Sequence, residues 1–172
     1  NNGDETAAEN LFRQCLNESQ RVGDQEFMLR SYADLLDMAF ENKRFQTWPK
    51  VKVEIKNLFE NRTGEETYRL LGSSLRKLGD LAMCAGAYDE ALNAYKRGLP
   101  LIAEFEVHEP YAVGQQVRLT NKRLTEQQID PALINQLGKD LFAFWRKEGL
   151  VSKSQEPLRI FHRWQKKELI YE

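Results

Sequence analysis

Apolar residues recur at helical spacing along almost the whole chain. The first such stripe consists of Ala8, Leu11, Phe12, Cys15 and Leu16. Residues three or four positions apart lie on the same face of an α-helix, so this stripe predicts a helix over about 5–21. A second amphipathic stretch predicts a helix over about 24–43, and the carboxylate of Asp24 is placed to cap its first free amides.

The segment 51–55 has two interpretations. Its alternation of apolar and polar residues is typical of a half-buried strand. Over a longer window, however, helical spacing is satisfied by Trp48, Val51, Ile55, Leu58 and Phe59. We favour a helix here, because Thr47 is placed to cap it and Pro49 falls in the first turn, where a missing amide donor costs little.

Turn and proline signals divide the rest of the chain into five further helices. These start after Gly64, at Asp89, at Glu109–Pro110, at Asp130–Pro131 and at Glu156–Pro157. Gly86 stops the first of them, Pro100 should end or kink the second, and Gly149 follows the end of the fourth. The sequence therefore predicts an all-α fold of about eight helices, forming a single array over residues 1–172.

Part of this pattern repeats. A shift of 43 residues superposes Phe45 on Tyr88, Leu35 on Leu78, and Ala39 on Ala82. The two units cover about 24–62 and 65–105, and a less regular helical part covers 106–172. A repeat of 20 to 50 residues is typical of a solenoid, in which each helix pair buries its apolar face against the next pair.

The second unit resembles a tetratricopeptide repeat. The residues that carry this resemblance are Leu78, Gly79, Met83, Gly86, Tyr88, Ala91, Tyr95, Gly98 and Leu99. The resemblance implies a right-handed α-solenoid, in which Gly79 and Ala91 let paired helices approach closely and Tyr95 fills the space towards the neighbouring pair. The first unit departs from the pattern, with Trp48 in place of a small residue and Lys43 in place of glycine. The whole arrangement is similar to the helical C-terminal arrays of bacterial STAND-type signalling ATPases.

Composition and charge narrow the function classes. Twenty-five Lys and Arg against 26 Asp and Glu leave a net charge of −1, so no overall field draws the chain to nucleic acid or an anionic membrane. No apolar run approaches the roughly 20 residues that span a bilayer, and two cysteines make no disulfide framework. We therefore expect a cytoplasmic protein. The start at Asn1, with no signal peptide pattern, suggests a fragment of a longer chain.

The residue types that carry chemistry are sparse. The candidates are His108, His162, Cys15 and Cys84, and their spacing matches no metal or nucleophile motif. The chain also has no glycine-rich phosphate loop. We therefore expect no enzyme activity, cofactor or metal.

The tetratricopeptide register implies that the first helix of each pair lines a concave groove for a protein or peptide partner. The candidate partner-binding residues are Arg30, Asp37, Phe40, Arg76, Asp80 and Met83. In the family, Lys, Arg and Asn side chains grip the C-terminal carboxylate of a peptide. Arg76 stands at one such position, but Asp37 and Asp80 stand where Asn is usual and would repel a carboxylate. The mixed charge and apolar spots of the groove suit a peptide or helix that is recognised in another way. The alternative interpretation is that these residues form only a solvated face.

Two alternative functions remain. The array is also interpretable as the regulatory helical tail of a larger bacterial signalling ATPase or effector. The C-terminal segment suggests nucleic-acid binding, because basic and aromatic residues interleave there at Arg159, Phe161, Arg163, Trp164, Lys166, Lys167 and Tyr171. We favour docking of this segment on the preceding helix, where its basic residues form the solvated face of the end of the array. The sequence leaves the oligomeric state open.

Overall fold

The computed structural model describes residues 2–61, 64–105 and 112–147, and this part of the chain is helical with no β-strand. These described residues form seven α-helices and one short 3₁₀ helix: α1 (Asn2–Val22), α2 (Gln25–Glu41), η1 (Phe45–Thr47), α3 (Trp48–Phe59), α4 (Glu65–Cys84), α5 (Tyr88–Phe105), α6 (Ala112–Glu126) and α7 (Pro131–Lys147). The predicted all-α class is confirmed. The predicted helix start at Glu109–Pro110 and the last predicted helix, after Glu156–Pro157, lie outside the described residues.

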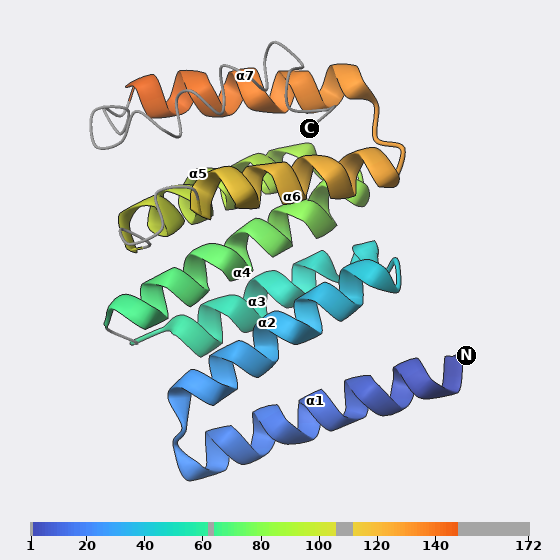
Figure 1. The fold of residues 1–172 in the computed structure, drawn as a ribbon, viewed down its shortest axis with the longest axis vertical. Coiled ribbons are helices and arrows are strands. Elements are labelled where there is room, and N and C mark those ends of the chain that lie inside the picture. The colour runs from blue at the N-terminus through green and yellow to red at the C-terminus, as the bar shows by residue number, and fades with distance from the viewer. Residues whose placement is uncertain (1, 62–63, 106–111, 148–172) are drawn as a thin grey trace.

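The helices lie across the longest axis of the molecule and follow one another along it, from α1 at one end to α7 at the other (Figure 1). Helix α2 packs against α1 and α4, and α4 in turn packs against α3, α5 and α6. Helix α5 also contacts α7. Helix α4 is therefore the element on which the two halves of the molecule meet.

Local signals account for most of the helix boundaries. The Asp24 carboxylate accepts a hydrogen bond from the backbone amide of Phe27 at 3.0 Å, which is the predicted N-cap of α2. Asp130 caps α7 in the same way, accepting from the amide of Ala132 at 2.9 Å. Gly86 follows the end of α4 with φ of +79°, a backbone conformation that favours glycine.

The structure decides two predictions: whether residues 51–55 form a helix or a strand, and whether a helix ends at Pro100. Residues 51–55 lie within α3, so the helical interpretation of this segment is confirmed. Thr47 precedes α3, but its hydroxyl donates to the carbonyl of Arg44 at 2.6 Å and does not cap the helix amides. Of the two outcomes expected at Pro100, an end or a kink of the helix, the end is wrong, because α5 continues through the proline to Phe105. Buried Leu99 and Ile102 lie on either side of the proline, and their packing holds the helix where one backbone hydrogen bond is missing.

The tightest packing lies between α4 and α5. A Cβ atom on Gly79 would lie 2.6 Å from Cε1 of Tyr95, so the ring of Tyr95 lies directly against the α4 backbone. Gly72 and Gly98 face each other, and a Cβ on either would lie 2.8 Å from the carbonyl oxygen of the other. Ala91 is completely buried. The close helix contact predicted from Gly79 and Ala91 is confirmed. The resemblance predicts that Tyr95 fills the space towards the neighbouring pair, but its ring lies against α4 of its own pair.

The apolar side chains form two clusters that share α4 and α5. One is built mainly from α2, α3 and α4, and the other from the C-terminal half of α4 together with α5, α6 and α7. Trp48 and Cys84 pack against both clusters and so join them. No helix within the described ranges is long and apolar enough to cross a membrane.

Candidate functional site

The six predicted partner-binding residues fall into three groups. Arg30 is exposed on α2, where it pairs with Glu66 at the start of α4 at 3.2 Å, away from the other five. Met83 is buried in the hydrophobic core. The remaining four belong to a network of polar contacts between α2, α4, α5 and α6: Asp37, Phe40, Arg76 and Asp80.

The centre of this network is Asp80. Its side chain is 0% exposed, and its Oδ1 accepts from the hydroxyls of Tyr95 at 2.7 Å and Thr120 at 2.9 Å. Its Oδ2 pairs with the guanidinium groups of Arg76 at 2.6 Å and Arg123 at 3.4 Å. Four donors from three helices therefore converge on one buried carboxylate, which is how a charge in the interior is accommodated.

Arg76 is almost as deeply buried, at 1% exposed. One turn before Asp80 on α4, it lies on the same helix face, and its Nη1 also donates to Thr120 Oγ1 at 3.0 Å. Its Nε is buried with no hydrogen-bond partner within the described part of the protein. Asp80 therefore supplies most of the interaction that offsets the cost of burying the positive charge of Arg76.

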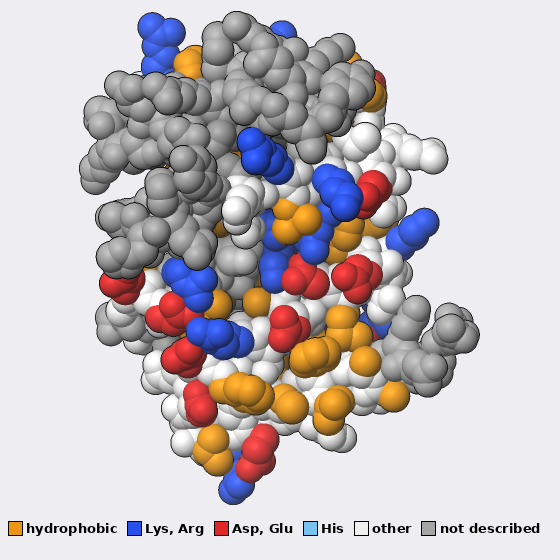
Figure 2. Space-filling model, viewed as in Figure 1, with side chains coloured by type: hydrophobic (Ala, Val, Ile, Leu, Met, Phe, Trp, Pro, Cys, Tyr) orange, Lys and Arg blue, Asp and Glu red, His pale blue; other side chains and the backbone are white. Residues whose placement is uncertain are grey.

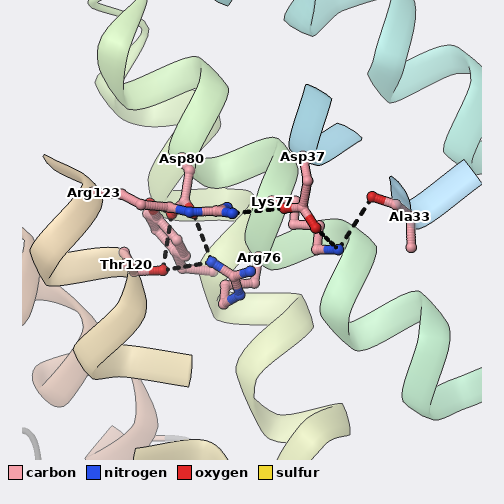
Figure 3. A network of polar contacts seen from close by, with 8 residues as sticks. Ala33, Asp37, Arg76, Lys77, Asp80, Thr120 and Arg123 are labelled. Atoms are coloured by element: carbon pink, nitrogen blue, oxygen red, sulfur yellow. Dashed lines mark hydrogen bonds and ion pairs between the residues drawn. The ribbon is translucent and has the colours of Figure 1, made fainter. Parts of the chain in front are cut away.

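A second carboxylate, Asp37 on α2, extends the network to the surface. Its Oδ2 accepts from Lys77 Nζ and its Oδ1 from Arg123 Nη2, each at 2.7 Å (Figure 3). Lys77 also donates to the backbone carbonyl of Ala33 at 3.1 Å. The side chain of Asp37 is 31% exposed, so this end of the network is open to water.

The pKa values follow from these contacts. Burial would raise the pKa of Asp37, but Lys77 and Arg123 outweigh it and hold that pKa below its ordinary value. Burial lowers the pKa of Lys77, and the attraction of Asp37 offsets only part of this effect. Burial and the Asp80 carboxylate both raise the pKa of Tyr95 well above its ordinary value, so its hydroxyl remains a donor at neutral pH.

Sequence reasoning missed four members of the network: Lys77, Tyr95, which it assigned only a packing role, and Thr120 and Arg123 on α6. Arg123 lies 86 residues from Asp37 and 43 from Asp80, so no local pattern links them. The available signal is the repeat, because the 43-residue shift places Asp37 on Asp80. Two equivalent acidic positions predict a basic partner between them, although not which residue supplies it.

A small cleft lies elsewhere, between α1, α2 and α3. Its volume is about 70 Å³, and its polar lining includes Glu9, Arg13, Tyr32, Arg44 and Glu54. These groups are paired among themselves: Glu9 binds both arginines, and the hydroxyl of Tyr32 lies 3.2 Å from a carboxylate oxygen of Glu54. Since ligand pockets usually measure roughly 300–1,000 Å³, this cleft is too small for a metabolite-sized molecule.

The other candidates for chemistry do not come together. Among the described residues, no three His, Cys, Asp or Glu side chains are placed to hold a metal ion. Cys15 and Cys84 are both half-buried free thiols, and burial together with Asp80 raises the pKa of Cys84 to about 12. His108, His162 and the basic C-terminal segment 159–171 lie outside the described residues.

Comparison with known proteins gives no further guide. No protein-family model matches the chain, and no curated protein or solved structure matches it. The functional argument therefore rests on the geometry of the network and of the helices that hold it.

Proposed function

We propose that the chain is a non-catalytic interaction scaffold, a right-handed α-solenoid of tetratricopeptide-like helix pairs that binds a peptide or protein across α2 and α4. The helix pairs α2–α3 and α4–α5 coincide with the two sequence units. The small and aromatic residues that carry the resemblance, Gly79, Ala91 and Tyr95, make the interhelical contacts that such a repeat needs.

One observation carries this proposal. Helices α2 and α4, the first helices of the two units, pack against each other, and their equivalent acids Asp37 and Asp80 both bind one arginine side chain. Their shared face therefore already recognises a side chain that a third element presents. Recognition of side chains from an added helix is what a peptide-binding scaffold does.

The reactivity of the described groups agrees with a binding role. A nucleophilic cysteine needs a lowered pKa, whereas that of Cys84 is raised to about 12. The buried carboxylate of Asp80 is fully occupied by donors from the protein itself. The site is thus built for electrostatic recognition.

A peptide selection tests this function. The full chain is used as bait against a displayed library of 15-residue peptides, and selected peptides are then titrated against the chain and two variants. Asp37→Lys reverses the charge at the exposed end of the network and should weaken binding at least tenfold. Lys50→Glu, a charge reversal at an exposed residue of α3, is the control and should bind as the wild type does. Failure to enrich any peptide, or equal binding by Asp37→Lys, contradicts the proposal.

A further inference from the structure

Arg123 reaches from α6 to three side chains on α2 and α4. We call Asp37, Phe40 and Asp80 the Arg123 site. Its two carboxylates take one guanidinium nitrogen each, at 2.7 and 3.4 Å, and the guanidinium carbon lies 4.9 Å from the centre of the Phe40 ring. Two separate acceptors and an aromatic face suit a planar guanidinium better than a compact ammonium group.

The helix that supplies this arginine has a small apolar contact with the rest of the protein. Among the described residues of α6, the buried apolar side chains are those of Val117 and Leu124, and the other buried positions are the polar Thr120 and Asn121. Helix α6 makes far fewer contacts with α4 and α5 than those two helices make with each other. Separating α6 therefore exposes less apolar surface than separating α4 from α5.

Charge also distinguishes α6 from α2, the helix that its Arg123 reaches. Helix α2 has a net charge of −3, from four carboxylates and one arginine, whereas α6 has a net charge of +2, from three cations and one glutamate. On the face that includes α2 and α6, basic side chains gather directly above a group of acidic side chains (Figure 2). Helix α4, on which α6 packs, carries three acidic and three basic residues, so the charge complementarity of α6 is with α2 and is made through the ion pair of Arg123 with Asp37.

We propose that α6 is an internal ligand of the partner-binding face, and that the partner is a helical peptide or protein segment that presents an arginine to the Arg123 site in place of α6. This inference rests on the proposed function and specifies its partner chemistry. Because α6 is attached to the same chain, its effective concentration at the site is high, on the order of millimolar for a short connection. In the free protein, the Arg123 site is therefore occupied by Arg123 itself, and a partner's arginine must compete with it.

The sequence of α6 supplies the probe. A fluorescently labelled peptide of residues 112–126 is titrated into the full-length chain and its anisotropy is measured. In the Arg123→Ala chain the internal ligand loses its anchor, and we expect the added peptide to bind at least tenfold more tightly than to the wild-type chain. A peptide carrying Arg123→Ala should show no saturable binding to either chain.

Lys122 provides the matched control, because it is a cation on the same helix but its side chain is 72% exposed. The Lys122→Ala chain should bind the peptide as weakly as the wild type, and the Lys122→Ala peptide should bind as the native peptide does. Helical circular dichroism establishes that each variant is folded. If the Arg123→Ala chain loses its helical signal, Arg123→Lys is used in its place. Lysine keeps the positive charge, but its single ammonium group cannot donate one nitrogen to each carboxylate as the guanidinium does.

The outcomes separate this inference from the proposed function. Absence of peptide binding to a folded Arg123 variant, or binding that does not depend on the arginine of the peptide, overturns the internal-ligand proposal. If the peptide library nevertheless yields ligands that depend on Asp37, the scaffold function stands and only the assigned partner chemistry is wrong.

Discussion

Replacement of Asp80 by alanine removes the group on which the polar network converges. In the native protein its two carboxylate oxygens accept from Tyr95, Thr120, Arg76 and Arg123, at 2.6 to 3.4 Å. Without the carboxylate, the guanidinium of Arg76 is still buried, and within the described residues it keeps only the hydroxyl of Thr120 as a partner. The variant therefore creates a buried charge without a counterion.

The expected loss of stability can be worked out from the loss of this counterion. Removing one partner of a buried ion pair typically costs about 3–5 kcal/mol, whereas the whole free energy of unfolding of a domain is roughly 5–15 kcal/mol. We expect Asp80→Ala to lose at least about 3 kcal/mol. At about 2–4 °C per kcal/mol for a chain of this size, Tm should fall by roughly 6–20 °C. Lys122→Ala, which breaks an exposed pair with Glu126, should lose at most about 1 kcal/mol.

Urea denaturation followed by circular dichroism at 222 nm measures these free energies. The decisive comparison is a double-mutant cycle with Arg76→Met, a replacement of similar length that carries no charge. Because the double variant no longer contains the unpaired charge, it should be more stable than Asp80→Ala alone. A loss below about 1 kcal/mol in Asp80→Ala, or strictly additive effects in the cycle, would refute the view that the two charges compensate each other.

Three further predictions concern packing and pH. Ala91→Leu should cost about 1–3 kcal/mol in urea denaturation because Ala91 is completely buried, whereas Asn93→Ala at an exposed position should cost little. Gly79→Ala should destabilise by a similar amount, because the added methyl group meets the ring of Tyr95; a gain in Tm would contradict this contact. The pKa of Asp37 is held below its ordinary 3.8, so the carboxylate stabilises the fold fully above pH 3.8, and this contribution is lost as the pH falls through the lowered pKa. In Asp37→Asn the free energy of unfolding should therefore fall less steeply between neutral and acid pH.

Most of the helical architecture could be predicted because its signals are local. The cap of α2 depends on Asp24 and an amide three residues away, and the start of α7 depends on the adjacent Asp130 and Pro131. Segment 51–55 was ambiguous only in a short window. Pro100 misled the prediction because the loss of one backbone hydrogen bond is local, whereas the packing that keeps α5 continuous comes from other helices.

The site was only partly predictable, since burial and partner choice are tertiary properties. Arg76 and Asp80 are four residues apart and therefore share a helix face, and in the structure they form an ion pair. Nothing in that spacing predicts that both are buried. The interpretation of Asp37 and Asp80 as groups that repel a carboxylate was sound chemistry, but it did not identify the arginine that their charge attracts.

The two equivalent acids, Asp37 and Asp80, differ in what their charges are available to do. Asp80 is completely enclosed and has four donors, so in the free protein its charge stabilises the junction of α4, α5 and α6. Asp37 is 31% exposed, and its partners among the described residues are the long side chains of Lys77 and Arg123. The contact that a partner's arginine can replace is therefore the one between Asp37 and Arg123. Lys77 would remain as the counterion of Asp37, and Asp80 would remain as the second acceptor for the incoming guanidinium. In the proposed function, Asp80 therefore mainly stabilises the fold of the free protein, and Asp37 is the acid that is available for recognition.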